Sequence, residues 1–432
     1  MTGDKMQKPT LKIKHRSNME LIIYLILVIN FSEGLISIFL PMIHPIYYLV
    51  DVLNVLLLLW IVRKRRSNIF RTNSLLPFSY SLYLFLGLSV LGILIHFSNV
   101  LLHLWGLRTV FSVYVFFVGC ILFERSDKTQ FLTKVFWINT IATIIEVLLG
   151  YRQDWIGGIY GVQGGQVNGP LNLLLVIVIS KEIVEYFNKK TTLKRVALYG
   201  LTSIIVASFA ELKFYYIEFL LIIAISSLVT RFSVRKLSII ILGALGISLG
   251  INMLFRLFPD IDNRMFSINF IWNYLTNKGG YVGQFAHNAG DINRLAFWSK
   301  ISDLYDNVFE MIFGKGLGNC DQISVLGLQS PFFTRYNYLH YYMFPLPMTL
   351  LQQGIVGGVI YIMLFVFILY AVKKQQKKGQ KERSIYQIAE VLCIMAFVIT
   401  IYDSSLQGRG AFLYYYMLAL PFLPHKRKEI RK

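Results

Sequence analysis

The residues best suited to chemistry in this chain are cations that lie apart from its basic clusters. Lys213 is the most isolated, because it separates two apolar runs in SFAELKFYYIEFL and stands two residues from Glu211. An arginine presents a planar fork to phosphate oxygens, and a lysine presents a mobile point charge. Several such side chains converging on one face would suit a diphosphate group. The scattered cations are Arg152, Lys213, Arg264, Lys278, Arg294, Lys300, Lys315, Arg335 and Arg409, with Arg108 and Arg256 nearer the ends of apolar runs.

Each cation taken alone also has a simpler explanation. Lys213 and Glu211 could form an ion pair that only ends two helices, or Lys213 could extend to a membrane interface. Arg409 lies in a polar turn, YDSSLQGRG, where an arginine is ordinary. The case for an anion site therefore depends on the set, and on the elements that would bring its members together.

Apolar runs of membrane-spanning length make up much of the chain, since hydrophobic residues occupy 55% of its 432 positions. A bilayer core needs about 20 apolar residues per helix. The pattern predicts an all-α polytopic membrane protein with about twelve spans. Their approximate ranges are 20–41, 45–62, 75–96, 107–123, 135–150, 169–187, 196–211, 213–230, 237–258, 346–372, 384–402 and 410–424.

The distribution of basic residues predicts which side of the membrane each connection faces. Most of the 43 Lys and Arg residues fall before, between or after alternate apolar runs, and the positive-inside rule places such segments in the cytoplasm. Both termini are therefore expected inside. The formal net charge of +20 is then a topology signal and does not indicate a nucleic-acid partner. The basic start of the chain precedes a full-length apolar run, so we expect a cytoplasmic tail there.

One predicted outer connection, residues 259–345, is far longer than the others. A loop above about 12–15 residues is usually functional or disordered, and the aromatic content of this one favours a folded segment. Apolar residues recur at steps of three or four within 293–313, which predicts one amphipathic helix on the outer leaflet. The stretch FGKGLGN at 313–319 predicts a glycine-rich turn. Residues 1–432 are expected to form a single membrane domain that contains this loop.

The sequence offers little that would bind a metal or form a disulfide. Its three cysteines, Cys120, Cys320 and Cys393, are far apart, and no Cys/His cluster has zinc spacing. Asp260 and Asp262 form a D-x-D pair in PDID, which alone is a weak signal. We therefore expect neither a metal nor another cofactor.

Three segments of the chain together form a recognisable pattern. The first is GIYGVQGGQVNGPLNLLLVIVI, at 158–179. The second is ASFAELKFYYIEFLLIIAI, at 207–225. The third is NRLAFWSKISDLYDNVFEMIFGKGLGN, at 293–319, which is followed by LLQQGIVGGVIYIMLF, at 350–365. These segments resemble, in the same order, parts of the bacterial O-antigen and exopolysaccharide repeat-unit polymerases of the Wzy type and of the related O-antigen ligases.

This resemblance implies a fold, a reaction and a location. The fold would be a GT-C-like glycosyltransferase of membrane helices with a large outer loop, in the bacterial cytoplasmic membrane. The reaction would be metal-independent and would transfer a glycan from undecaprenyl diphosphate to another lipid-linked repeat unit, during synthesis of a capsule, O-antigen or other surface polysaccharide. The implied partners are the undecaprenyl-diphosphate-linked donor and acceptor and the lipid bilayer. A chain-length regulator and a flippase are candidate further partners.

The resemblance also assigns roles to single residues. Lys213 matches the family's basic residue between paired spans, and Arg294 matches the arginine of the long loop, so both would bind the diphosphate. Arg335 and Arg409 have no such match; as cations of the predicted outer side they are weaker candidates for binding the diphosphate. Tyr338 is a candidate for stacking on a sugar ring, although tyrosines at a membrane interface are often ordinary belt residues.

A general base for the acceptor hydroxyl would be His340 or, in second place, Glu211. His340 lies in NYLHYYMFPLP and is the nearest match to the family's histidine, but it is displaced by a few residues, and His287 competes with it. Ligases more often have a His-Asn pair at this place. The absence of that pair here slightly favours a polymerase.

Two other functions remain as alternatives. One is an O-antigen ligase-type transferase, and the other is a flippase or transporter of the same lipid-linked oligosaccharide. An even number of spans with both ends inside is common in transporters. Transporters usually also show repeated halves and helices broken at the midplane, and the sequence shows neither.

Overall fold

The computed structural model describes most of the chain. The described residues are 18–39, 48–64, 74–124, 129–162, 167–212, 214–230, 235–257, 297–379, 381–402, 405–408 and 410–423. Within these ranges the chain is almost entirely helical, with a two-stranded antiparallel hairpin in which Gln322 pairs with Gln329 and Ile323 with Leu328.

The elements follow one another along the chain as α-helices, short 3₁₀ helices (η) and two strands. Their bounds are α1 (Asn18–Phe39), α2 (Tyr48–Lys64), α3 (Leu76–Ile95), α4 (Val100–Phe123), α5 (Gln130–Leu148), η3 (Gln153–Trp155), η4 (Gly158–Tyr160), α6 (Asn168–Phe187), α7 (Leu193–Phe209), α8 (Tyr215–Val229), α9 (Arg235–Leu257), α12 (Phe297–Ser302), α13 (Val308–Phe313), β1 (Gln322–Ile323), η6 (Ser324–Leu326), β2 (Leu328–Gln329), α14 (Pro331–Tyr336), η7 (Asn337–Leu339), η8 (Tyr341–Met343), α15 (Pro345–Lys378), α16 (Arg383–Tyr402), η9 (Ser405–Gln407), α17 (Ala411–Ala419) and η10 (Leu420–Phe422).

The predicted apolar segments all coincide with helices, namely α1 to α9 and α15 to α17. Among the described helices, α3, α4, α5, α15 and α16 are each long and apolar enough to cross a membrane. The prediction of an all-helical membrane protein is therefore confirmed. Some boundaries differ from the prediction, because α4 begins at Val100 and α5 begins at Gln130, ahead of the apolar runs that marked them.

Apolar side chains cover the outer faces of several helices, which is the surface expected of a protein surrounded by lipid. Large exposed apolar patches of this kind are rare on water-soluble proteins. Lipid tails, in contrast, are themselves apolar and leave no such surface exposed to water. The exposed residues on α2, α3 and α5 include Val52, Val55, Leu59, Leu84, Leu91, Leu94, Ile141, Ile145 and Leu148.

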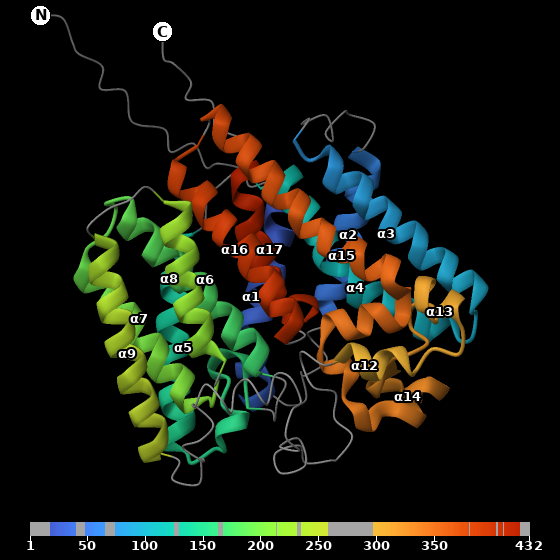
Figure 1. Cartoon of the computed structure of the whole chain (residues 1–432), viewed down its shortest axis with the longest axis horizontal. Helices are drawn as coiled ribbons and strands as arrows, with labels where there is room; N and C mark the ends of the chain where they lie inside the picture. The colour runs from blue at the N-terminus through green and yellow to red at the C-terminus, as the bar shows by residue number, and fades with distance from the viewer. Residues whose placement is uncertain are drawn as a thin grey trace, which may run out of the picture.

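The helices divide into two groups around a buried centre (Figure 1). Helices α7, α8 and α9 lie on one side, whereas α3, α4 and α15 lie on the other. Between them α16 contacts α6, α8, α15 and α17. All nine residues of α17 are buried, and α6 is buried along nearly its whole length. The core thus lies where the two groups meet.

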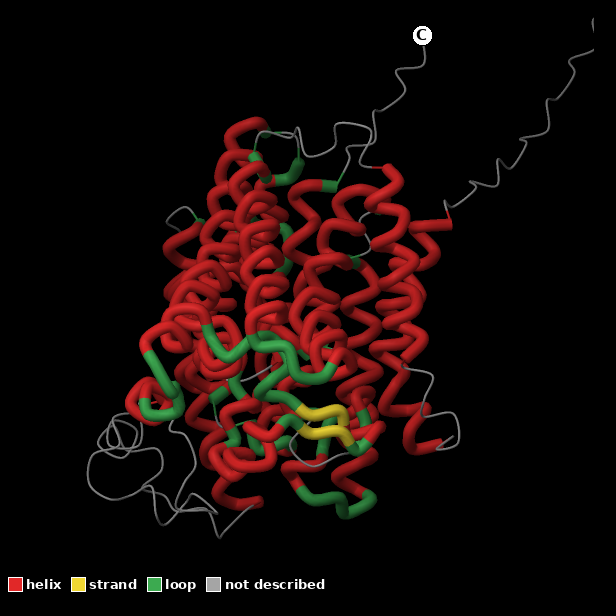
Figure 2. The backbone as a smooth tube through the Cα atoms, turned by 90° about the vertical axis from the view of Figure 1, so that its right-hand side faces the viewer, coloured by secondary structure: helices red, strands yellow, loops and turns green. Residues whose placement is uncertain are grey.

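Residues 297–344 form a folded cap at one end of this bundle (Figure 2). The cap contains α12, α13, the hairpin and α14, and it contacts α4 and α15 directly. It has its own apolar centre, which includes Ile301, Phe333, Leu339 and Tyr341 and continues into Leu350 of α15. The prediction that the long loop is folded is confirmed for this described part.

The predicted single amphipathic helix over 293–313 is wrong in its described part, 297–313. Two helices, α12 and α13, stand there, with a turn between them. Asn307 has an extended backbone, and its side chain accepts a hydrogen bond from the N–H of Glu310 at 2.9 Å. An asparagine in this position begins a new helix. As a result Ile301 is buried while Val308 is exposed, so the apolar residues do not share one face.

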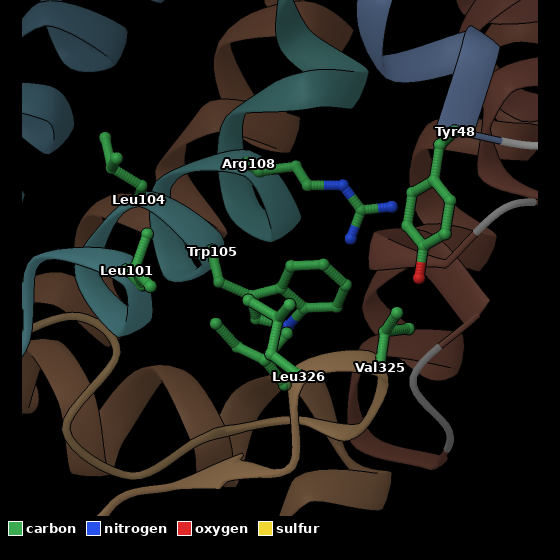
Figure 3. Close-up of a pocket in the computed structure, with 8 residues that line it drawn as sticks. Tyr48, Leu101, Leu104, Trp105, Arg108, Val325 and Leu326 are labelled. Carbon is green, nitrogen blue, oxygen red and sulfur yellow. The ribbon is translucent and has the colours of Figure 1, made fainter.

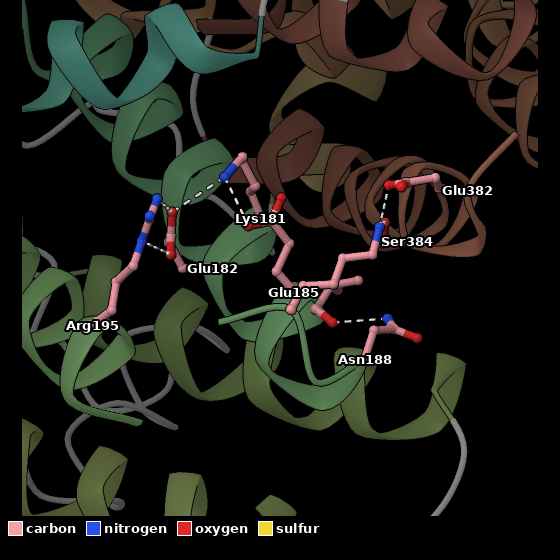
Figure 4. A network of polar contacts seen from close by, with 9 residues as sticks. Lys181, Glu182, Glu185, Asn188, Arg195, Glu382 and Ser384 are labelled. Atoms are coloured by element: carbon pink, nitrogen blue, oxygen red, sulfur yellow. Dashed lines mark hydrogen bonds and ion pairs between the residues drawn. The ribbon is translucent and has the colours of Figure 1, made fainter. Parts of the chain in front are cut away.

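At the opposite end of the bundle, charged side chains join two connections that were both predicted to be cytoplasmic (Figure 4). Lys190, after α6, contacts Glu382 and donates a hydrogen bond to Ser384 at 2.7 Å. Asn188 donates to Gln387 at 2.6 Å. Contacts between the α6–α7 and α15–α16 connections place them on the same side, as the alternation of basic segments requires.

A partly buried ion-pair network lies behind these contacts, within α6 and α7. The Lys181 ammonium lies 3.2 Å from Glu182 and 3.0 Å from Glu185. Arg195 donates two hydrogen bonds to the Glu182 carboxylate, at 2.8 and 2.9 Å. Mutual pairing explains how these charges are accommodated at the end of an apolar helix, because an isolated buried charge is strongly destabilising.

The orientation of the bundle gives a first testable prediction. The cap is expected outside and the α6–α7 connection inside, as the positive-inside rule requires. Cysteines introduced at exposed Thr334 in the cap and at exposed Lys194 serve as a matched pair, because the three natural cysteines are all buried. Thr334→Cys should react with a membrane-impermeant maleimide in intact cells, and Lys194→Cys only after lysis. The reverse pattern would overturn the orientation.

Candidate functional site

The predicted glycine-rich turn at 313–319 is the feature that fixes the cap to the bundle. Gly314, Gly316 and Gly318 have φ values of +82°, +88° and +91°. Each lies close to the backbone of a bundle helix: an added Cβ would come within 2.3 Å of Gln352 at Gly314, 2.8 Å of Gly92 at Gly316 and 2.3 Å of Leu102 at Gly318. A side chain at any of the three would clash and strain the backbone. The prediction of a turn is confirmed, and its glycines let it enter between α3, α4 and α15.

A break in α15 receives this turn. Gly354 has φ +67° and ψ −171°, so the helical hydrogen bonds cannot continue past it. The carbonyls just before it bond to the cap instead: Leu351 accepts from the N–H of Lys315 at 2.9 Å, and Gln352 accepts from the N–H of Gly316 at 3.0 Å. The Tyr305 hydroxyl donates to the carbonyl of Leu350 at 2.8 Å. The carbonyls exposed by the break are thus satisfied by the cap.

Two polar side chains fasten the other side of the turn to the α3–α4 connection. The Asn319 amide donates to the carbonyls of His96 and Lys315, both at 2.7 Å. His103 lies 2.6 Å from the carbonyl of Leu317 through Nδ1, and its Nε2 accepts from the N–H of Ser98 at 3.1 Å. Because Nε2 accepts, Nδ1 must carry the proton that it donates to Leu317. His103 is thereby a structural residue with both nitrogens occupied.

Lys315 is held inside the cap by two carboxylates. Its ammonium lies 2.8 Å from Asp306 and 2.5 Å from Glu310, and it also sits 5.6 Å from the centre of the Phe332 ring. Burial lowers the pKa of Lys315, but the hydrogen bonds with the two carboxylates outweigh burial and leave the pKa above its ordinary value. This cation therefore stays charged and neutralised by its neighbours, and it serves the packing of the cap.

Three of the predicted site residues lie on the cap, within six positions of one another in the sequence. Arg335 is exposed on α14, with its guanidinium 5.1 Å from the centre of the Tyr336 ring. Tyr338 is 49% exposed in η7. His340 is half-buried between η7 and η8, with a left-handed backbone (φ +51°) and its ring 5.9 Å from that of Tyr342.

Of the remaining predicted residues, Glu211 is described and does not join this group. Glu211 lies in the turn between α7 and α8, where its φ is +53°. Figure 1 shows α7 and α8 on the far side of the bundle from α12 and α14. Six residues of the predicted site or its alternatives lie outside the described residues, namely Lys213, Arg294, Arg409, His287, Asp260 and Asp262. Within the described ranges no group of three or more His, Cys, Asp or Glu side chains could hold a metal ion.

A second buried turn, at residues 157–161, overlaps the start of the segment 158–179. Residues 157–161 enter between α1 and α5, where an added Cβ at Gly34 would come within 1.9 Å of the Gly161 nitrogen. The Glu146 carboxylate accepts from the N–H groups of Gly157 at 3.1 Å and Gly158 at 2.7 Å. Non-helical backbone buried among membrane helices requires such partners. The role of Glu146 was not visible in the sequence, because it stands in an apolar run.

This arrangement predicts a graded effect of substitutions at Glu146. In Glu146→Ala two buried N–H groups lose their acceptor, which should cost about 3 kcal/mol of stability. Glu146→Gln keeps an acceptor oxygen and should cost less than half as much. Thermal denaturation of the purified protein in detergent, followed by size-exclusion chromatography, measures both. Equal losses in the two variants would show that the carboxylate does not act through these hydrogen bonds.

A pocket of about 380 Å³ opens where α4 and α2 meet the hairpin of the cap (Figure 3). Arg108 extends into it from α4, and its guanidinium lies 4.2 Å from the centre of the Trp105 ring and 6.0 Å from that of Tyr48. The rest of the lining is apolar and consists of Leu101, Leu104, Ile323, Val325 and Leu326. Sequence reading placed Arg108 among the scattered cations but gave it no role. The spacing of Leu101, Trp105 and Arg108 on one helical face was the available signal.

Taken together, these features define an all-helical membrane protein with a folded cap that is built into one end of the bundle. No protein-family model matches the chain, and no curated protein matches it.

Proposed function

We propose that the chain is a polymerase of oligosaccharide repeat units linked to a polyprenyl diphosphate, acting at the outer face of the cytoplasmic membrane. In this proposal all twelve long apolar segments cross the membrane, both termini are cytoplasmic, and the fold is GT-C-like. The proposal continues from the resemblance of residues 158–179, 207–225 and 293–319 to the Wzy-type polymerases and O-antigen ligases.

The observation that carries the proposal is the folded cap, on which three of the candidate residues stand. Arg335, Tyr338 and His340 lie within six positions on a folded segment that is fixed to membrane helices by the glycine turn. An enzyme that joins lipid-linked sugars needs its reacting groups held at the membrane surface, where the carrier's headgroup lies. Because the cap is hydrogen-bonded directly to the break in α15, its residues are held at a fixed position relative to the membrane helices. A soluble domain attached by a linker would not be held in this way.

The proposed roles follow the chemistry of the reaction. The donor sugar leaves a diphosphate, so cations must stabilise the charge that develops on the departing oxygen. Arg335 is the candidate for this stabilisation among the described residues. Lys213, Arg294 and Arg409 are the further candidates, and they lie outside the described residues. His340 would accept the proton of the acceptor hydroxyl, with Glu211 as the second candidate. Tyr338 presents an exposed ring to a sugar.

A reconstitution experiment tests the proposal. The purified full chain, in lipid nanodiscs, is given a synthetic polyprenyl-diphosphate-linked repeat unit, and the products are separated by size. A polymerase yields a ladder of products. A single transfer to a different acceptor would instead support a ligase-type transferase. In proteoliposomes, movement of the substrate across the bilayer without bond formation would support a flippase.

A further inference from the structure

We propose that the pocket lined by Tyr48, Trp105, Arg108 and Leu326 binds the phosphate headgroup of a membrane lipid. The pocket is separate from Arg335, Tyr338 and His340 in sequence and in the elements that form it. It lies between the first turns of α2 and α4 and the loop of the hairpin. Three elements far apart in the chain therefore meet around one arginine.

Arg108 has hydrogen-bonding capacity that the described protein does not use. Its Nε lies 2.8 Å from Asp51, and its planar face lies on Trp105. Despite this ion pair, Nε is a buried nitrogen that makes no hydrogen bond of good geometry within the described residues, and in Figure 3 the guanidinium points between Trp105 and Tyr48. The two terminal nitrogens form the fork that matches two oxygens of a phosphate. Asp51 and Trp105 hold this fork in position.

The walls of the pocket select an amphiphilic anion over a soluble one. Leu101, Leu104, Val325 and Leu326 are all more than one-third exposed, so the mouth of the pocket is apolar. A nucleotide or a free sugar phosphate would desolvate polar groups against these side chains without gaining hydrogen bonds. A lipid gains from the same contact, because its chain lies on the apolar wall while its phosphate meets the arginine.

The outer face of α2 supplies a path for the chain of such a lipid. Tyr48 begins a row along one helical face that continues through Val52, Val55 and Leu59 at steps of three or four residues. These three residues are exposed, with Leu59 at 59%. A pocket of about 380 Å³ holds a phosphate and the first few carbons, and the remainder of the chain would follow this row into the bilayer.

One further acidic group acts on Arg108 and tunes the charge of the pocket. Burial raises the pKa of Asp321 to about 6, against the opposing effects of the Gln322 N–H and of the Arg108 charge. Asp51 is the ion-pair partner of Arg108, while Cys320 and Tyr341 are the other titratable groups that interact with Asp321. At pH 7.5 Asp321 is ionised and opposes an anion, whereas at pH 5 it is mostly protonated and does not.

Direct binding to the purified full chain tests the inference without any turnover. The probes are a polyprenyl monophosphate, phosphatidylglycerol and inorganic phosphate, with affinity measured by native mass spectrometry or thermophoresis in detergent. Arg108→Gln removes the fork and should weaken lipid-phosphate binding about tenfold or more. Leu326→Glu places a negative charge at a position that is 58% exposed, so it should fold normally and weaken binding to a similar degree.

Two controls make these measurements specific. Arg63 also lies over a tryptophan, 5.6 Å from the centre of the Trp60 ring, but at the other end of α2, so Arg63→Gln should leave affinity within about twofold. Asp321→Asn should tighten binding at pH 7.5 and change it little at pH 5. Unchanged affinity in both pocket variants, or an equal loss in Arg63→Gln, would overturn the inference.

Comparison of the affinities for the three probes identifies which molecule supplies the phosphate. Inorganic phosphate binding as tightly as the lipids would overturn the assignment to a lipid. Preference for the polyprenyl phosphate would support the site. If the proposed function also holds, this pocket would bind one of the two carrier lipids that polymerisation brings together. Equal binding of phosphatidylglycerol would still support a lipid-phosphate site but would assign it to the surrounding bilayer. If the chain forms no polymer in the reconstitution experiment, it could therefore still bind a lipid phosphate at this site.

Discussion

Gly354→Ala is expected to detach the cap from the bundle and to destabilise the protein by about 3–4 kcal/mol, the combined cost of backbone strain and of a steric clash. The backbone of Gly354 has φ +67° and ψ −171°, a combination that essentially only glycine adopts. An added Cβ would come within 2.2 Å of the carbonyl oxygen of Ile312 and 2.5 Å of the Phe313 nitrogen. Both contacts are with backbone, which cannot move aside as a side chain can. If α15 becomes a continuous helix instead, the carbonyls of Leu351 and Gln352 no longer accept from the cap.

The measurement is the fraction of protein that elutes as a single species after stepwise heating, compared with the wild type. Gly87→Ala is the matched control, because Gly87 lies in α3 and an added Cβ there would meet no atom within 4 Å. Alanine also favours a helix over glycine by about 1 kcal/mol, so this control should be neutral or slightly stabilising. Wild-type heat resistance in Gly354→Ala would contradict the role of the break in holding the cap.

The sequence predicted the helices well because hydrophobic length alone determines where a membrane helix can form. It predicted their ends less well, since α4 and α5 extend beyond the apolar runs into residues such as His103 and Gln130. Within the cap the pattern misled, because apolar residues at helical spacing continue through 303–307. The side chain of Asn307 caps the first turn of a new helix there, so one helix-capping residue outweighed the periodicity.

The geometry of the candidate site depended on contacts between residues that are distant in sequence. The glycines at 314, 316 and 318 predicted a turn, but the backbones that they approach belong to Gln352, Gly92 and Leu102. Nothing in the run that contains Gly354 marked a break, because glycines are common in membrane helices. Residue type identified Arg335 and Tyr338 as candidates, and the match to the family's histidine identified His340. The pocket around Arg108 could not be identified, because its walls come from three separate parts of the chain.

The second large effect is expected at Arg294, which lies outside the described residues and precedes α12 in the chain. If Arg294 binds the diphosphate, as the resemblance to the Wzy-type polymerases implies, Arg294→Ala should lower the rate of polymerisation on the order of 10²–10³-fold. Loss of one contact made in the transition state typically costs about 3–4 kcal/mol, which corresponds to that factor. Arg294→Lys keeps the charge but loses the fork, so it should also lose most of the activity.

Lys300 is the matched control for Arg294, because it is an exposed cation on α12, only six positions away. Lys300→Ala removes the same charge from the same segment and should lower the rate no more than about twofold, since an exposed lysine makes little net contribution. Initial rates of ladder formation by the purified variants, at equal amounts of folded protein, measure the difference. Equal losses in the two alanine variants would mean that activity depends only on the total charge of this segment. Near-normal activity in Arg294→Ala would remove Arg294 from the diphosphate site.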